Sequence, residues 1–434
     1  MPLFPQESLN DDVRKREVFG WAMYDFANSG YTTVVLTAVF NTYFVGVAAN
    51  GADWGTLAWT LVLGLSSLIV MLTMPALGAY ADLRAAKKRL LAITTVGCVL
   101  STLMLALVGR GDVWLAGLAI VLSNVFYAYG ESLTAAFLPE LARGEAMGRV
   151  SGWGWGFGYL GGMLSLGLSL AYVLHAQARG MPATEFVPVT MLITAAVYGL
   201  ASLATFALLR ERAVPVVAPL RLPGLRAALQ RLGQTWQRAR QHRDFCWLLA
   251  CGAAYQAGIS VVIALAAVYA EQALGFQQSD TMMLVLLVNI AAAVGAFAFG
   301  YFQDRAGHKW SLAVTLVGWI AMTVLAALAT GPALFWVAAV IAGLCMGSSQ
   351  SAGRAMAGLF APARHVAEFY GLWTFAIRLS AIVGPVTYGL VTLLSGGNHR
   401  MAILSTAVFF VAGLLLLAPM NMARGRAAAL RVQA

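Results

Sequence analysis

The chain has 434 residues, of which 60% are hydrophobic and only 11% are charged, and its formal net charge is +10. Soluble globular proteins carry roughly 25% charged residues, so this composition excludes a soluble domain and predicts an integral membrane protein. The net charge alone would also fit a nucleic-acid partner, so the positions of the basic residues decide what it means.

Apolar stretches long enough to cross a bilayer recur along the whole chain. A hydrocarbon core of about 30 Å needs about 20 residues of helix. Twelve stretches meet this length, near residues 18–46, 55–80, 90–109, 113–138, 150–174, 187–209, 245–271, 281–302, 310–329, 332–353, 369–394 and 401–420. The polar segment before the first stretch lacks a signal-peptide cleavage site, so we expect that span to be retained. The sequence therefore predicts an all-α membrane protein with twelve transmembrane helices.

Most basic residues lie on one side of this predicted bundle. Of the 28 lysines and arginines, Arg110, Arg179 and Arg400 fall in loops on one side and Arg378 falls within a span, which leaves 24 for the other side. The positive-inside rule then places both termini in the cytoplasm, and we expect a bacterial plasma (inner) membrane protein. The net charge reflects topology and contact with membrane lipids, and we expect no nucleic-acid partner.

A basic segment at residues 210–243 separates the first six spans from the last six. It holds eight arginines and a single acid, Glu211. We expect a six-helix bundle at residues 1–209 and a second one, with a short cytoplasmic tail, at residues 244–434. Apolar residues recur at helical spacing from Leu225 to Trp236, which fits either an interfacial helix on the inner leaflet or a solvated linker.

Two independent alignments indicate an internal duplication. An aspartate follows a glycine by four residues at Gly78 and Asp82 and again at Gly300 and Asp304, an offset of 222 residues. Residues 135–162 align without gaps on residues 358–385, at an offset of 223. Offsets that agree to within one residue predict two pseudo-symmetric six-helix bundles.

These features resemble the major facilitator superfamily over essentially the whole chain. The second Gly-Asp loop continues with Arg305 and Gly307 and so is similar to that superfamily's Gly-x-x-x-Asp-Arg-x-Gly-basic motif, whereas the first copy lacks the glycine before its basic run. The resemblance implies a major facilitator fold in which two bundles rock about a midplane site. It also implies a gating role for Gly78, Asp82, Gly300, Asp304 and Arg305.

Two further stretches resemble one branch of this superfamily. WAMYDFANSGYTTVVLTAVFNTYF in the first span and EFYGLWTF at the start of the eleventh are similar to the branch that contains the autophagy-linked vacuolar amino-acid effluxers and many bacterial relatives. The resemblance implies a secondary transporter whose substrate is a small polar solute such as an amino acid.

In the first span, Asp25, Asn28 and Thr32 share one helix face. An ionised carboxylate at this depth costs at least about 2.5 kcal/mol, so Asp25 must face the protein interior, a wet cavity or a cation. Because the resemblance implies that this span lines the central cavity, we predict that the stripe binds a proton or the substrate. The alternative is a polar contact between packed helices.

Glu131 lies about 10 Å inside the fourth span and aligns with Arg354 of the tenth through the internal repeat. Opposite charges at equivalent positions favour a gate in which Glu131 and Arg354 pair across the halves on the cytoplasmic side. Glu131 is also a second candidate for proton coupling. The alternative is that each side chain snorkels to the inner interface.

Arg378 lies roughly 14 Å inside the eleventh span, and its guanidinium can hold a carboxylate through two hydrogen bonds. Its partner is either a substrate carboxylate, with the substrate amine on Asp25, or the side chain of Asp25 or Glu131. Neutral polar side chains inside neighbouring spans are predicted to complete the site, namely Asn124, Tyr127, Tyr255, Gln256 and Gln350.

Six glycines crowd residues 152–162 of the fifth span. Small residues let membrane helices approach closely. We expect this surface to pack against Ala291, Gly295 and Ala298 of the eighth span as a sliding contact between the halves.

No HExxH, GxSxG or P-loop pattern is present, and the histidines fall in loops or at span ends. We therefore expect no enzyme, no cofactor and no metal site. The prediction is a monomeric secondary transporter of a small polar solute, coupled to protons through Asp25 or Glu131. The alternatives are an exporter or flippase of an amphipathic or lipid substrate, and a membrane sensor that transports nothing.

Overall fold

The computed structural model describes residues 4–52, 54–215, 225–276 and 278–431. Apart from a two-residue bridge between Leu9 and Ala142, the described residues form helices and loops. Twelve helical segments are long and apolar enough to span a membrane, which confirms the predicted fold class.

Six of these segments come from the first half of the chain. The first combines α1 (Lys15–Tyr31) with π-helical turns at Thr32–Ala38, the short α2 (Phe40–Tyr43) and further π-helical turns at Phe44–Ala48. The others contain α3 (Gly55–Arg84), α4 (Lys87–Leu105), α5 (Val113–Ala135), α7 (Met147–Ala178) and α8 (Ala183–Leu208), with the short α6 (Leu138–Leu141) between α5 and α7.

The second half repeats this pattern. Its spans contain α10 (Arg243–Leu274), α11 (Gln278–Ala306), α12 (His308–Leu328), α13 (Pro332–Phe360) and α14 (Val366–Leu394), followed by α15 (His399–Ser405) and α16 (Ala407–Leu417), which together form the twelfth. Two amphipathic helices lie outside the spans, α9 (Leu225–Arg240) and α17 (Met422–Arg431).

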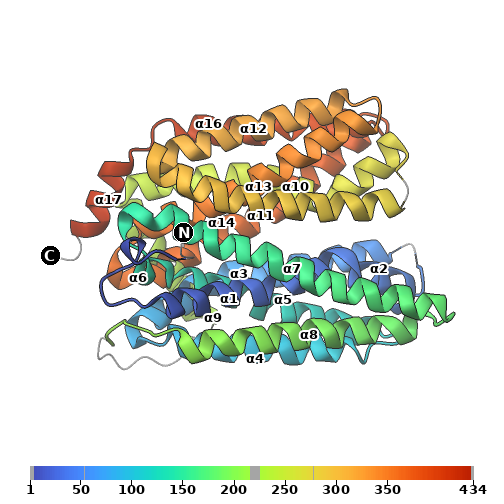
Figure 1. The fold of residues 1–434 in the computed structure, drawn as a ribbon, viewed down its shortest axis with the longest axis horizontal. Helices are drawn as coiled ribbons and strands as arrows, with labels where there is room; N and C mark the ends of the chain where they lie inside the picture. Colours follow the sequence, from blue (N-terminus) through green and yellow to red (C-terminus); the bar gives the residue numbers. More distant parts are fainter. Residues whose placement is uncertain (1–3, 53, 216–224, 277, 432–434) are drawn as a thin grey trace.

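The spans pack as two bundles, with α1 to α8 on one side and α10 to α16 on the other (Figure 1). Across the boundary, α3 packs against α14, and α7 packs against α11 and α13. These crossings need small residues, since a methyl group on Gly78 would collide with the Ala367 carbonyl and one on Gly152 with the Ala296 carbonyl. The exact limits of the bundles, at residues 209 and 244, stay a prediction.

The basic segment between the halves contains a helix, α9, that packs against α3, α10 and α14. Thr235 and Arg238 of α9 both donate hydrogen bonds to the Glu368 carboxylate, at 2.5 and 2.6 Å. Most of the apolar residues that predicted this helix have side chains outside the described set. Its contact with a membrane surface therefore stays a prediction.

The two bundles meet tightly at the end of the molecule that carries α6, α9 and α17, which we call the terminal end (Figure 1). In α14, every residue from Val366 to Thr374 is buried, whereas residues 381–383 are all exposed. Three consecutive helical residues span about 200° of the helix circumference, so the far half of α14 is covered on little more than one face. The halves are therefore closed together at the terminal end and part toward the opposite end.

Candidate functional site

Four charged side chains meet inside the bundles. Asp25 of α1 and Glu131 of α5 belong to the first half, and Arg354 of α13 and Arg378 of α14 belong to the second. Each acid pairs with an arginine of the other half, Asp25 with Arg354 and Glu131 with Arg378. The set is electrically neutral and ties the halves together at two points.

The Asp25–Arg354 pair is short and buried. Arg354 Nη1 donates to Asp25 Oδ2 at 2.6 Å, while its Nε and Nη2 donate to the Ser151 hydroxyl and carbonyl at 3.1 and 2.7 Å. The guanidinium also lies over the rings of Trp21 and Trp155, at 4.8 and 5.3 Å from their centroids. Gly154 makes room for this cluster, because a methyl group there would strike Asp25 Oδ2. A buried arginine with this many partners holds α1, α7 and α13 in one arrangement.

The Glu131–Arg378 pair is long and open. Its Nη2–Oε2 distance is 3.4 Å, longer than the roughly 2.7–2.9 Å of a good charge-assisted hydrogen bond. The Glu131 side chain is 38% exposed although it lies inside a span, and Arg378 is 13% exposed. Arg378 Nε is buried and has no hydrogen-bond partner among the described residues, and the guanidinium lies 5.8 Å from the Tyr127 ring centroid. This pair therefore combines a partly exposed carboxylate with a guanidinium that has an unused donor.

The structure thus contradicts the predicted gate pair but contains one of the partners predicted for Arg378. The Glu131–Arg354 pair is not formed, and Arg378 faces Glu131 rather than Asp25. The reason is helix packing: α13 lies against α7, whose Gly154 lets Arg354 reach Asp25, whereas α14 lies against α5. The internal alignment gave the depth of each charge but not the direction in which its side chain points.

The neutral residues of the predicted site divide into two groups. Some already donate hydrogen bonds within the protein: Asn124 donates to Ser66 at 2.6 Å, Gln256 to Gln350 at 2.7 Å, and Thr32 to the Ser29 carbonyl at 3.0 Å. Others are buried with spare capacity, since Asn28 Nδ2 and the Tyr255 hydroxyl lack partners among the described residues. Tyr127 stacks on Tyr31, with ring centroids 5.3 Å apart.

The two Gly-Asp loops hold the terminal end closed in the same way. Asp82, at the end of α3, accepts hydrogen bonds from the Ala367 and Glu368 amides at the start of α14, at 3.1 and 2.9 Å. Asp304, at the end of α11, accepts from the Gly148 and Arg149 amides at the start of α7, at 2.9 and 3.1 Å. Each carboxylate therefore caps a helix of the opposite half, where free amides and the helix dipole favour a negative charge.

The rest of the gating set lies close to these caps. Gly300 packs against the backbone of Gly148 and Arg149, with a methyl group there predicted to stand 3.1 Å from the Arg149 Cα atom. Arg149 adds a hydrogen bond from Nε to Asp304 at 2.8 Å. Arg305 is exposed and forms no ion pair with a described residue, so its predicted gating role has no contact here to support it.

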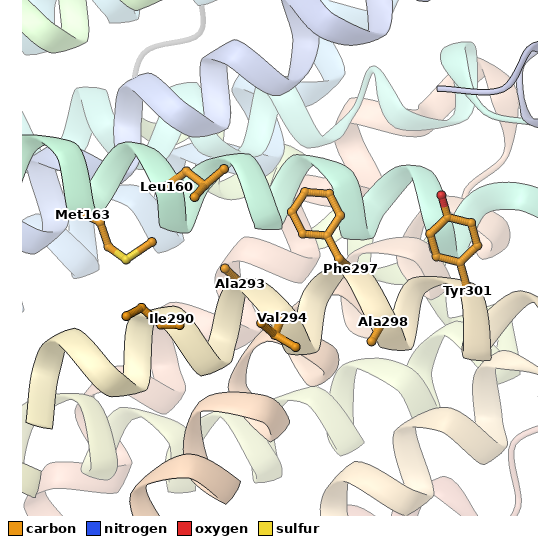
Figure 2. Close-up of a pocket in the computed structure, with 8 residues that line it drawn as sticks. All are labelled: Leu160, Met163, Ile290, Ala293, Val294, Phe297, Ala298 and Tyr301. Atoms are coloured by element: carbon orange, nitrogen blue, oxygen red, sulfur yellow. The ribbon is translucent and has the colours of Figure 1, made fainter. Parts of the chain in front are cut away.

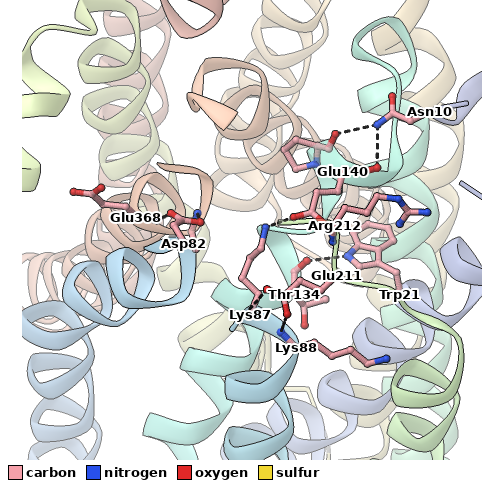
Figure 3. Close-up of polar contacts among 12 residues, drawn as sticks. Asn10, Trp21, Asp82, Lys87, Lys88, Thr134, Glu140, Glu211, Arg212 and Glu368 are labelled. Atoms are coloured by element: carbon pink, nitrogen blue, oxygen red, sulfur yellow. Dashed lines mark hydrogen bonds and ion pairs between the residues drawn. The ribbon is translucent and has the colours of Figure 1, made fainter. Parts of the chain in front are cut away.

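The terminal end of the first half contains a polar cluster that sequence reasoning missed (Figure 3). Lys87 forms an ion pair with Glu140, and the Lys87 and Lys88 amides donate to the Glu211 carboxylate at 2.6 and 3.0 Å. Arg212 bonds Asp12 and thereby lowers the pKa of the Asp12 carboxyl. The cluster joins α4, α6, the start of the basic segment and the N-terminal arm. The partners lie too far apart in the sequence to be matched from it.

A groove of about 680 Å³ runs between α7 and α11 (Figure 2). Leu160 and Met163 line one wall and residues 290–301 the other, and Tyr301 is the single polar side chain among the lining residues. The predicted glycine surface of α7 does pack against α11, but through Ala296 and Phe297. Gly295 instead faces Leu344 of α13, so that part of the prediction is wrong.

Comparisons with known proteins place the chain in a family. Residues 58–430 match the family model described as Atg22-like vacuole effluxers. An uncharacterised major facilitator transporter of Bacillus subtilis, YxiO, is 28% identical over 92% of this chain and 93% of its own length. Autophagy-related protein 22-1 of Aspergillus niger is 28% identical over 47% of this chain and 35% of its own length.

Solved structures with low sequence identity share the fold. The human organic anion transporter MFSD10 has a TM-score of 0.72 at 14% identity, over 93% of this chain and 99% of that one. The Escherichia coli fucose:proton symporter has a TM-score of 0.69 at 13% identity, over 94% and 98%. These findings confirm the resemblance that the sequence motifs indicated and exclude an enzyme. The chain is a multi-pass membrane transporter of the major facilitator superfamily and belongs to the family of Atg22-like vacuole effluxers.

Proposed function

We propose that this transporter moves a small zwitterion, most simply an amino acid, by alternating access, and that Glu131 and Arg378 form its substrate site. The observation that carries the proposal is the open Glu131–Arg378 pair, in which a partly exposed carboxylate and a guanidinium stand 3.4 Å apart inside the membrane, and Arg378 Nε has no hydrogen-bond partner among the described residues. A zwitterion supplies one charge to each member of such a pair.

The chemistry of binding follows from the two side chains. The substrate carboxylate would accept hydrogen bonds from Arg378, and the substrate ammonium would donate to Glu131. Tyr127, whose ring centroid lies 5.8 Å from the Arg378 guanidinium, would supply a neighbouring aromatic contact. This assignment differs from the sequence expectation of an amine on Asp25, because Asp25 is already bound at 2.6 Å by Arg354.

The Asp25–Arg354 pair would act as the gate. Together with the Asp82 and Asp304 caps it holds the terminal end closed, and the positive-inside rule assigns that end to the cytoplasm. The structure would then be open to the outside, and a bacterial ferroportin homologue solved in an outward-facing state shares its fold with a TM-score of 0.69. Protonation of Asp25 would remove the charge that holds Arg354, which provides a route for proton coupling. We further propose that the protein acts as a monomer in a plasma membrane.

The apolar groove between α7 and α11 favours a second candidate function, export of an amphipathic substrate. Such a substrate would enter sideways from the lipid, and this groove opens between the halves with Tyr301 as its single polar lining residue. None of the residues that line it belongs to the four-charge set, so a lipid moving along the groove would not contact those charges.

Flux through purified protein in proteoliposomes tests these candidates. Amino acids, dipeptides and fluorescent phospholipids are presented at two pH values to the wild type, to Glu131→Gln, and to Glu185→Gln as a matched change at an exposed acid of α8. We expect amino-acid uptake by the wild type and Glu185→Gln, and its loss in Glu131→Gln. Lipid flux without amino-acid uptake would support the second candidate instead.

A further inference from the structure

The groove between α7 and α11 lies at the depth of the membrane and faces outward. Leu160 of α7 is 44% exposed, and Ile290 and Val294 of α11 are 46% and 54% exposed. These residues fall in the middle of spans rather than in loops. What surrounds them in a membrane is hydrocarbon, so the occupant of the groove must be apolar over this length.

The groove has one polar end, which points toward the terminal end of the molecule. Tyr301 closes it there and is 37% exposed. One helical turn further, and therefore on the same face of α11, stands Arg305, which is exposed and forms no ion pair with a described residue. The Arg149 guanidinium lies 5.6 Å from the Tyr301 ring centroid, but its charge is balanced by its ion pair with Asp304, which leaves Arg305 to bind an anion at this end.

From these observations we infer that the groove binds an anionic phospholipid, with one acyl chain between α7 and α11 and the phosphate on Arg305. An apolar groove at bilayer depth, with an arginine one helical turn beyond its end that pairs with no described residue, matches the two parts of such a lipid. The terminal end carries most of the basic residues of the chain, so the lipid comes from the leaflet on that side.

A lipid bound in this groove would shift the balance between the conformational states of the transporter. The groove lies between one helix of each half, where the halves begin to part. A ligand that fits the groove only in this arrangement stabilises the state closed at the terminal end, by the difference in its affinity for the two states. The inference does not rest on the nature of the transported substrate.

Melting temperatures of the full-length protein in detergent test the inference, with phosphatidylglycerol or phosphatidylcholine of identical acyl chains added. We expect phosphatidylglycerol to raise the melting temperature by about 3 °C more than phosphatidylcholine does. Val294→Trp fills the groove and should abolish the difference, whereas Val317→Trp changes a residue of α12 with a similar exposed fraction, 55%, and should keep it. Arg305→Gln should abolish the difference, and Arg364→Gln, at another exposed arginine of the terminal end, should keep it.

Two controls keep the outcome decisive. Melting in phosphatidylcholine alone shows whether each variant folds, and Ala298→Phe fills the groove from a second position, so that a single poorly folded variant does not decide the result. The inference is overturned if the difference survives in the groove-filling variants, or if Val317→Trp loses it equally. It is also overturned if light scattering shows that the groove variants act by breaking a dimer, or if they abolish phospholipid flux, since the groove would then be a dimer interface or a transport path.

Discussion

Asp25 and Glu131 are two carboxylates inside the same bundle, yet their surroundings assign them different roles. Asp25 is buried and receives a 2.6 Å hydrogen bond from an arginine that is itself fixed by Ser151. Glu131 is 38% exposed and only loosely paired. A carboxylate that is held tightly across the halves suits a gate, and a partly exposed carboxylate suits ligand binding.

The first prediction concerns Asp25→Asn. Asparagine can still accept a hydrogen bond from Arg354, but it has no charge and binds no proton. One proton moved down a gradient of one pH unit supports about tenfold accumulation of substrate, since one unit corresponds to about 1.36 kcal/mol. We expect this accumulation ratio to fall to about one in Asp25→Asn, while exchange of internal for external substrate continues.

Uptake and exchange of radiolabelled substrate in the same proteoliposomes measure both quantities. If accumulation in Asp25→Asn follows the pH gradient as in the wild type, the proton does not pass through Asp25 and the assignment fails.

The residue scale also shows how far sequence alone reaches. The unusual residue type and depth of Asp25, Glu131, Arg354 and Arg378 marked them as candidates. The Glu131–Arg378 pair was one of the alternatives, but the sequence could not decide among the pairings, because successive residues point about 100° apart around a helix and the rotation of each helix is fixed by its neighbours. The anchor Ser151 was missed for the same reason, since a serine in a glycine-rich span carries no distinguishing pattern.

At the scale of elements, the turn after α3 contains a strained residue. Ala85 has φ +49° and ends the helix in the left-handed region, at the position equivalent to Gly307, whose φ is +95°. The two turns differ in conformation, because ψ is +50° at Ala85 and +143° at Gly307, and the left-handed conformation of Ala85 carries strain that glycine would not. A non-glycine residue in this region costs roughly 1–2 kcal/mol.

We accordingly predict that Ala85→Gly stabilises the protein by about 1 kcal/mol, because the left-handed conformation costs glycine little. Ala92→Gly, within the regular helix α4, should destabilise it by a similar amount. Thermal unfolding of the two variants in the same detergent compares them, and a loss of stability in Ala85→Gly would show that the turn is not strained.

The crossing of α3 and α14 gives a third prediction. A methyl group on Gly78 would collide with the Ala367 carbonyl beside the Asp82 cap, whereas Gly64, in the far half of α3, has no non-neighbouring atom within 4 Å of the added carbon. Gly78→Ala should therefore loosen the terminal end, and Gly64→Ala should leave it intact.

The measurement is the labelling rate of a single cysteine placed at Thr374, which is buried in the closed terminal half. We expect at least about a tenfold faster rate in Gly78→Ala, which corresponds to a shift of about 1.4 kcal/mol in the balance between states. Equal rates in the two glycine variants would argue against a tight crossing at Gly78.

Elements were predicted well where hydrophobic length decides and poorly where local backbone detail decides. All twelve spans follow from the need for about 20 apolar residues. The π-helical turns at Thr32–Ala38 and the break between α15 and α16 leave that length unchanged, so hydropathy does not reveal them. The glycine run of α7 indicated a close helix contact, but the residues of α11 that it meets, Ala296 and Phe297, differ from the predicted ones.

At the scale of the whole molecule, two equivalent helix caps hold the duplicated halves together. Asp82 of the first half caps α14 of the second, and Asp304 of the second half caps α7 of the first. The offsets in the sequence predicted this symmetry, and the sequence also placed both acids of the core in the first half and both arginines in the second, but it did not predict which acid pairs with which arginine. Separation of the halves at the terminal end therefore requires both caps and the Asp25–Arg354 pair to open.

The central claim is that Glu131 and Arg378 each hold one charge of a zwitterion, and binding of charge-deleted analogues tests it most directly. Affinities are measured for the transported amino acid, for its amide, which lacks the carboxylate, and for its N-acetyl derivative, which lacks the ammonium. We predict that Glu131→Gln weakens binding of the amino acid by about tenfold to a hundredfold, which is the contribution of a hydrogen bond to a charged group. The affinity for the N-acetyl derivative should not change. Arg378→Gln should weaken binding of the amino acid by a similar factor and leave the affinity for the amide unchanged. Equal losses for the amino acid and the analogue that lacks the matching charge, in either variant, would contradict the proposed site.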